Sequence, residues 1–333
     1  MSEALPPASS TTGASPDSST SSTADLGVGH RASGTAYGLA AYGAWGLFPL
    51  YFSALRPAGA LEVLVHRVLW AFLLCLLVVM VLGQLRLLRR TLASRRTLLV
   101  VGLAGALIAA NWTLYIVAVL TGHVTEAALG YFLNPLVTVA LGVLVLREHL
   151  RPAQWVAVAL GAVAAAYLSF DYGAPPWLSL ALAFSFASYG LVKKHLGVSL
   201  SAIQSLTAET MVVSPLALGV LSYLILTGQD TFTTEGWAHT LLLLGAGVAT
   251  TVPLLWFAAA ARRIPLSTVG LLQFLTPVLQ LLCAVLLLGE SMPSSRWVGF
   301  ALVWTALVVL STDSLVTARR SRRRTRTTAA PAP

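Results

Sequence analysis

Charged and strongly polar side chains occur inside long apolar stretches of this sequence, where they could bind a small solute or carry a proton. Four residues share this property: Glu62, His66, Arg67 and Glu209. If the stretches cross a membrane, a charge at a helix centre costs about 2.5–3.5 kcal/mol, so such residues usually face a cavity or a partner. We therefore expect coupling or gating roles for all four. The alternative for Arg67 is a structural anchor whose long side chain reaches the membrane surface.

A second set of residues combines aromatic rings with amide and hydroxyl groups, which suits a binding cavity for a small organic molecule. Asn111 and Tyr115 are four residues apart and therefore share a helix face. Tyr131 and Asn134, three residues apart, do likewise. The expected cavity residues are Tyr42, Trp45, Asn111, Trp112, Tyr115, Tyr131, Asn134, Trp256 and Gln273. The alternative is that the rings form belts at the membrane surface and the polar groups hold helices together.

Motifs typical of enzymes are absent from the sequence. It contains no phosphate-binding glycine loop with a lysine, no nucleophile elbow and no paired spacing of metal ligands. Cys75 and Cys283 both lie in apolar stretches, so we expect them to be small core residues with no disulfide or metal role. We therefore expect no enzymatic activity, no metal site and no cofactor.

The composition indicates which elements carry these residues. Hydrophobic residues make up 57% of the chain and charged residues 10%, whereas ordinary soluble domains carry about 25% charge. Apolar runs of roughly 20 residues, the length that crosses the hydrocarbon core, recur along the sequence. We predict an all-α polytopic membrane protein with ten transmembrane helices, near residues 34–55, 60–82, 97–120, 124–146, 153–170, 176–192, 202–226, 237–261, 264–288 and 295–316.

The sequence also contains an internal repeat with an offset of 142 residues. Of the 43 positions from Leu129 to Asp171, 16 are identical to their partners in the second half, and Pro135 aligns with Pro277. Both prolines are expected to kink their helices, because proline lacks the N–H that continues helical hydrogen bonding. We expect repeats at residues 34–173 and 174–316, a disordered tail at 1–33 and a basic cytoplasmic tail at 317–333. Five helices in each repeat make the two repeats inverted in the membrane.

The positive charges are placed as in membrane proteins rather than as in nucleic-acid-binding proteins, despite a formal net charge of +9. With the N-terminus in the cytoplasm, 18 of the 21 lysine and arginine residues fall in cytoplasmic connections and the tail. Arg56 and Arg296 fall at outer ends, and Arg67 lies within the membrane. Because cytoplasmic connections carry an excess of positive charge, we expect both termini inside and no nucleic-acid partner.

Six stretches of the sequence resemble the RarD subfamily of EamA-domain permeases, in the drug/metabolite transporter superfamily. The longer ones are Asn111 to Ile116 (NWTLYI), His123 to Leu136 (HVTEAALGYFLNPL) and Ala258 to Thr268 (AAAARRIPLST), and the shorter ones are His66-Arg67 through Trp70, Arg147-Glu148 and Gln154-Trp155. The resemblance extends over about residues 34 to 316 and implies ten helices, two EamA repeats and a bacterial inner-membrane location. It does not cover the Ser- and Thr-rich leader or the arginine-rich tail.

These observations together predict a secondary transporter that exports a small amphipathic metabolite or drug by alternating access. Its expected partners are the small-molecule substrate and the lipid bilayer, with a proton as the candidate coupling ion. One alternative is a facilitative uniporter. A second alternative, from another class of protein, is a membrane assembly or interaction protein that transports nothing.

Overall fold

The structure is a computed structural model that describes residues 20–147, 150–172, 176–196, 200–261, 263–264, 268–269 and 272–328. These residues form helices and turns, with no β-strand among them. In chain order the elements are α1 (Thr20–Gly46), α2 (Phe48–Ser53), α3 (Ala60–Val81), α4 (Leu85–Leu92), α5 (Arg95–Leu120), α6 (Val124–Leu146), α7 (Pro152–Tyr172), α8 (Trp177–Leu196), α9 (Ala202–Leu226), α10 (Trp237–Ala261), α12 (Leu275–Leu282), the π-helix η2 (Cys283–Leu287) and α13 (Ser294–Thr328). The all-helical part of the predicted fold class is confirmed.

Within these ranges, seven helices are long and apolar enough to cross a membrane by length and composition. The seven candidate spans are Ala60–Val81, Arg95–Leu120, Val124–Val145, Pro152–Phe170, Ala202–Leu226, Trp237–Ala261 and Ser294–Asp313. Two further apolar helical stretches, Trp177–Lys193 and Leu275–Leu287, are shorter. The chain is therefore a multi-span helical membrane protein, while the count of ten crossings stays a prediction.

The first expected membrane segment is not a single helix. It is divided between α1 and α2 at Leu47, and Pro49 lies in the first turn of α2, where a missing N–H removes no helical hydrogen bond. At its other end, α1 begins at Thr20, inside the tail that was expected to be disordered; residues 1–19 lie outside the described residues. The helix α13 likewise continues through Thr328, into the expected basic tail.

The expected segment at 264–288 also departs from one continuous α-helix. Residues 265–267 and 270–271 lie outside the described residues, and α12 passes directly into the π-helix η2. Pro277 therefore lies in the first turn of α12, where its missing N–H has no helical partner to lose. Pro135, its partner in the repeat, lies inside α6. The two prolines thus occupy different places in their helices.

The helices α3 and α9 pack against each other in antiparallel directions. At the start of α3, the Glu62 carboxylate accepts hydrogen bonds from Thr231, which follows the end of α9. Near the start of α9, Gln204 Nε2 donates to Gln84 Oε1, which follows the end of α3, at 3.0 Å. Polar contacts therefore link the two helices at both ends of the pair.

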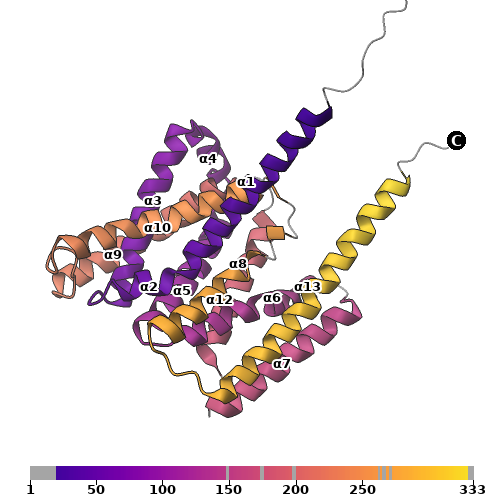
Figure 1. The fold of residues 1–333 in the computed structure, drawn as a ribbon. Helices are drawn as coiled ribbons and strands as arrows, with labels where there is room; N and C mark the ends of the chain where they lie inside the picture. The colour runs from indigo at the N-terminus through magenta and orange to yellow at the C-terminus, as the bar shows by residue number, and fades with distance from the viewer. Residues whose placement is uncertain are drawn as a thin grey trace, which may run out of the picture.

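A second pair of helices, α7 and α13, lies side by side at one edge of the molecule (Figure 1). An ion pair joins them, with Arg151 Nη2 2.9 Å from Asp313 Oδ2. Arg151 precedes the first residue of α7, whereas Asp313 lies well along α13, so this pair is also antiparallel. The N-terminal end of α1 and the C-terminal end of α13 extend from the same end of the bundle in Figure 1.

A close contact between α3 and α10 depends on the lack of a side chain at Gly247. A Cβ atom at this position would lie 2.5 Å from the backbone carbonyl carbon of Trp70 and 2.7 Å from its oxygen. Backbone atoms cannot move aside as a flexible side chain can, so the two helices approach this closely only with glycine at 247. This contact holds α10 against the helix that carries Arg67.

Candidate functional site

Arg67 is buried between helices from both halves of the chain. The residue is 5% exposed, and its Nε donates a hydrogen bond to Thr250 Oγ1 of α10 at 2.9 Å. Its guanidinium lies over the indole ring of Trp112 on α5, with Cζ 4.1 Å from the ring centroid. Neither ion pair in the described part of the chain includes Arg67. A buried cation is therefore held by a hydroxyl and aromatic rings rather than by a carboxylate.

Other aromatic rings surround the same guanidinium. Its Cζ lies 5.3 Å from the ring centroid of Phe48 and 5.4 Å from that of Phe52, both on α2. The attraction between a cation and an aromatic ring amounts to about 2 kcal/mol or more where both are desolvated, so these rings offset part of the cost of burial. Three tyrosines also lie close enough to interact with Arg67 electrostatically: Tyr51, Tyr115 and Tyr131.

Asn111 connects this site to the second half of the chain. Its Nδ2 donates to the backbone carbonyl of Leu182 and to Ser185 Oγ, both at 3.0 Å and both on α8. Its Oδ1 accepts a longer hydrogen bond from the Tyr131 hydroxyl at 3.4 Å. The Tyr131 ring lies 5.6 Å from the ring of Tyr115, whose buried hydroxyl has no hydrogen-bond partner among the described atoms.

Tyr42 and Trp45 form a separate aromatic group with Phe257. The centroid distances are 5.5 Å between Tyr42 and Trp45, 6.1 Å between Tyr42 and Phe257, and 6.0 Å between Trp45 and Phe257. The backbone carbonyls of α1 here accept hydrogen bonds from α12: Thr276 Oγ1 donates to Tyr42 O at 2.9 Å, and Gln280 Nε2 to Trp45 O at 3.2 Å. This group therefore lies at the packing interface of α1 with α10 and α12.

The remaining expected cavity residues are more dispersed. Asn134 is buried on α6 and its Oδ1 has no hydrogen-bond partner in the described structure. Trp256 is half-buried on α10, and Gln273 is exposed just before α12. The structure thus brings together with Arg67 only part of the expected set, namely Trp112, Tyr115, Tyr131 and, through Tyr131, Asn111. One shared water-accessible cavity for all of them stays a prediction.

Glu209, the repeat partner of Arg67, has a complete set of partners. Lys193 Nζ of α8 lies 2.6 Å from its Oε1, and Ser205 Oγ donates to the same oxygen at 2.7 Å. The Tyr189 hydroxyl donates to Oε2 at 3.0 Å. Glu209 is 1% exposed. The two charges that the repeat makes equivalent therefore have different surroundings, because the anion is paired with a cation and Arg67 is not.

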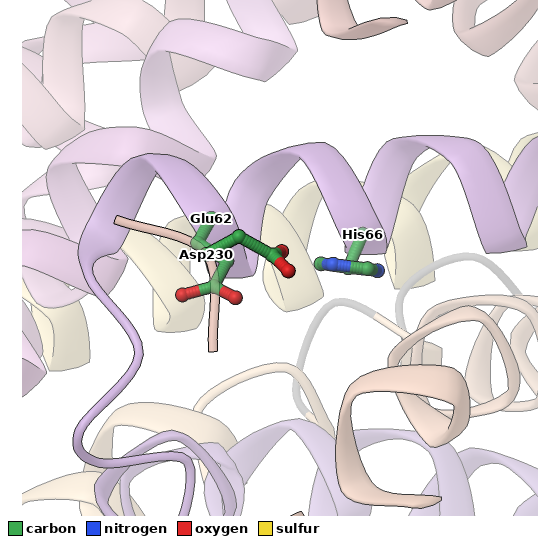
Figure 2. Close-up of side chains that lie close together, drawn as sticks. All are labelled: Glu62, His66 and Asp230. Atoms are coloured by element: carbon green, nitrogen blue, oxygen red, sulfur yellow. The ribbon is translucent and has the colours of Figure 1, made fainter. Parts of the chain in front are cut away.

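Glu62, His66 and Asp230 lie close together at the N-terminal end of α3. Each offers one ligand-type atom, and these atoms all lie within 4.8 Å of one another. Figure 2 shows Glu62 and His66 on successive turns of α3, with Asp230 from the connection after α9 beside Glu62. Thr231 Oγ1 donates to Glu62 Oε2 at 2.9 Å, and the same hydroxyl lies 2.7 Å from His239 Nε2. With His239 included, the group contains two carboxylates and two imidazoles.

The hydrogen bonds of His66 decide what this cluster can bind. Trp70 Nε1 donates to His66 Nδ1 at 3.0 Å, and a neutral imidazole that accepts at one nitrogen carries its proton on the other. His66 Nε2 is therefore a donor, and it has no hydrogen-bond partner among the described atoms. A metal ion needs a nitrogen lone pair, so the observed arrangement suits protons and hydrogen bonds better than a metal. The expectation of no metal site stays a prediction.

The residues that neutralise or bind these buried groups were not predicted from the sequence. Lys193 carried a signal, because it is one of only two lysines and it follows an apolar stretch. Thr250 carried none: its hydroxyl donates to Ala246 O at 2.8 Å, as an ordinary helical threonine does, and accepts from Arg67 only through the packing of α10 on α3. Asp230 and Thr231 lie 168 and 169 positions after Glu62 in the sequence, and only folding brings them close to it.

Comparison with known proteins identifies the family. The model of the EamA-like transporter family matches the chain twice, over residues 32–170 and 176–312. A relative named Protein RarD from Streptomyces exfoliatus is 51% identical over 291 residues, which are 87% of this chain and 92% of that protein. A protein of Pseudomonas aeruginosa named as an uncharacterized transporter is 43% identical over 289 residues, covering 86% of this chain and 96% of its own.

A solved crystal structure shows a similar fold. It covers 84% of this chain and 97% of its own, with a TM-score of 0.56 and 19% sequence identity. At this identity the likeness concerns the fold alone. The duplicated family match and the identity to RarD proteins extend over most of the chain. This chain therefore belongs to the EamA-like transporter family, within the drug/metabolite transporter superfamily.

Proposed function

We propose that this protein is a secondary transporter that exports a small amphipathic metabolite or drug by alternating access. The observation that carries the proposal is the double match to the EamA-like transporter family, one match in each half of the chain. The candidate binding site is the surroundings of Arg67, to which the first half contributes Trp112 and the second half contributes Thr250. A site between two repeats near the middle of the membrane is typical of secondary transporters.

The proposed architecture is ten transmembrane helices in two inverted repeats, at residues 34–173 and 174–316. Under the offset of 142 residues, α3 is equivalent to α9 and α7 to α13. Equivalent helices that run antiparallel are expected for inverted repeats, and both pairs do so. The same offset makes α5 equivalent to α10, and the membrane part of α1 equivalent to α8. The contacts agree with this, since α5 packs on α8 and α10 packs on α1. These relations support the proposed inversion.

Both termini are proposed to lie in the cytoplasm of a bacterial cell, with the protein in the inner membrane. The distribution of arginine and lysine between the connections carries this orientation. The helix ends at Thr20 and Thr328 extend from the same end of the bundle (Figure 1), as an even number of crossings requires. The proposed cytoplasmic end is then the one that contains the Lys193–Glu209 ion pair.

The proposed gates are the polar contacts at the two ends of the α3–α9 pair. One gate is the contact of Glu62 with Thr231, and the other is the contact of Gln204 with Gln84. Opening the molecule at one end breaks one contact while the other holds the helices together. Glu62 and Asp230 are the proposed proton site of the outer gate, because a proton shared between two close carboxylates relieves their repulsion.

The test is flux across reconstituted proteoliposomes with a panel of labelled small amphipathic compounds. We expect at least one compound to move only in vesicles that contain the protein, and to accumulate when a pH gradient is imposed. Movement that never exceeds equilibration would instead identify a facilitative uniporter. If no compound in a broad panel moves although the protein is folded in the vesicles, the transport proposal fails and an assembly or interaction role takes its place.

A further inference from the structure

We infer that the molecule bound at Arg67 is an organic anion, with a carboxylate group that pairs with the guanidinium and an aromatic or apolar part that packs on the surrounding rings. The inference deepens the proposed function by naming the chemical class of its substrate. The statement that this anion is transported rests on the proposed function. The statement that it binds rests only on the geometry of the buried arginine.

The first step is the charge of Arg67. An unpaired charge inside a protein costs several kcal/mol, and no carboxylate in the described ranges forms an ion pair with Arg67. Two buried glutamates, Glu62 on α3 itself and Glu209 on α9, are engaged elsewhere. Glu62 accepts from the backbone N–H and the hydroxyl of Thr231, and Glu209 is paired with Lys193. An anionic ligand would supply the opposite charge that Arg67 does not receive from any described residue.

The second step is the direction of the free donors. A guanidinium has five N–H groups in one plane. The Cζ of Arg67 lies 4.1 Å from the centroid of the Trp112 ring, and Thr250 accepts from Nε. Nη1 and Nη2 form no hydrogen bond with the described residues. Since carboxylates bind the edge of a guanidinium in a bidentate manner, these two nitrogens leave donors available to a carboxylate.

The third step is the nature of the walls. Phe48, Phe52 and Trp112 lie with their rings within 5.4 Å of the guanidinium carbon. The hydroxyl of Tyr115 is also buried without a hydrogen-bond partner, and its ring contacts that of Phe52 at a centroid distance of 5.9 Å. A strongly hydrated inorganic anion gains little from such walls, whereas an anion with an aromatic or alkyl part gains from burying that part against the rings. The ring-lined surroundings therefore favour an organic carboxylate.

The inference is tested by binding to the full-length protein in nanodiscs. The probes are three carboxylates, phenylacetate, indole-3-acetate and octanoate, each compared with its primary amide, and sodium sulfate as an inorganic anion. A primary amide keeps the shape of the acid but not its charge, and a hydrogen bond to a charged group is stronger than one between neutral groups. We expect at least one acid to bind, its amide to bind about tenfold to hundredfold more weakly, and sulfate not to compete.

Variants then assign the binding to Arg67. Arg67→Gln should abolish the preference for the acid over its amide, and Arg67→Lys should restore it in part, because lysine keeps the charge but lacks the planar fork. The matched control is Arg56→Gln, which removes an exposed arginine whose Nη2 donates to Leu120 O. A thermal unfolding curve for each variant separates loss of binding from loss of fold.

Three results would overturn the inference. They are equal binding of acids and amides, no binding of any acid by folded parent protein, and an unchanged acid preference in folded Arg67→Gln. Flux of neutral or cationic compounds together with no binding of any acid by the folded parent protein would leave transport standing and refute the anion site. Arg67-dependent binding of an acid that never crosses the vesicle membrane would support the anion site and refute transport.

Discussion

The ammonium nitrogen of Lys193 lies 2.6 Å from a carboxylate oxygen of Glu209, and this ion pair joins α8 to α9 inside the bundle. The Lys193 side chain is 30% exposed and that of Glu209 1%. At the equivalent position of the first repeat, Arg67 is buried and no described residue forms an ion pair with it. Of the two charges at equivalent positions, Glu209 is balanced by Lys193, whereas Arg67 contacts a hydroxyl and aromatic rings.

The Lys193–Glu209 pair should couple α8 to α9 energetically. We expect Lys193→Met and Glu209→Gln each to lower the free energy of unfolding, and the double variant to show a coupling energy of about 0.5–3 kcal/mol. The measurement is denaturation in mild detergent, analysed as a double-mutant cycle. The control cycle uses Arg151→Met and Asp313→Asn, a more exposed pair for which about 0.2–1 kcal/mol is expected. Equal coupling in both cycles would contradict the assigned role of the buried pair.

Neutralising the two equivalent charges should shift the balance between inward-open and outward-open states. Arg67→Gln and Glu209→Gln act on opposite sides of the proposed inversion axis, so they should change the balance in opposite directions. Rates of thiol labelling at single cysteines introduced at Glu235 and at Ser94, in a background without Cys75 and Cys283, report the two sides. If both variants fold, transport and label like the parent, the two charges are structural and the gating proposal loses its support.

The outer cluster should couple flux to the proton gradient. Asp230→Asn removes one of two neighbouring carboxylates, so we expect flux to continue while its response to an imposed pH gradient falls severalfold. Glu235→Gln is the matched control, because Glu235 is exposed in the same connection between α9 and α10. The measurement is uptake into proteoliposomes with and without a gradient. A full response in Asp230→Asn would exclude this carboxylate from coupling.

The contact at Gly247 should not tolerate a methyl group. We expect Gly247→Ala to lower the thermal stability and the yield of folded protein, since its Cβ would overlap the backbone of Trp70. Gly43→Ala is the control, because a Cβ there meets no atom within 4 Å, and alanine favours a helix over glycine by about 1 kcal/mol. Differential scanning fluorimetry in detergent measures both. Equal stability of the two variants would mean that α10 can move away from α3 at little cost.

The orientation of the chain can be tested with reporters. A reporter that is active only in the cytoplasm should be active when fused after Arg320 and inactive when fused within the connection at Glu235. A reporter that is active only outside should give the opposite result. Activity of the external reporter after Arg320 would contradict the cytoplasmic location of the C-terminus and, with it, the proposed direction of the gates.

Composition and periodic apolar runs were enough to predict an all-helical membrane protein, because the bilayer admits few other structures for so apolar a chain. The same information did not fix the form of every segment. The division at Leu47 and the passage of α12 into a π-helix depend on local packing and on proline position, which apolar runs do not record. The placement of Pro277 in a first turn follows from where α12 begins, which the alignment with Pro135 could not reveal.

The sequence by itself singled out Arg67, Glu209, Glu62 and His66, because charges inside apolar runs are costly and so demand an explanation. It could not name their partners. Thr250 and Asp230 come to these residues from distant parts of the chain, and nothing in their local sequence marks them. Only tertiary packing decided that Glu209 is neutralised while Arg67 faces aromatic rings, because that outcome depends on which helix faces meet and not on the order of residues along any one helix.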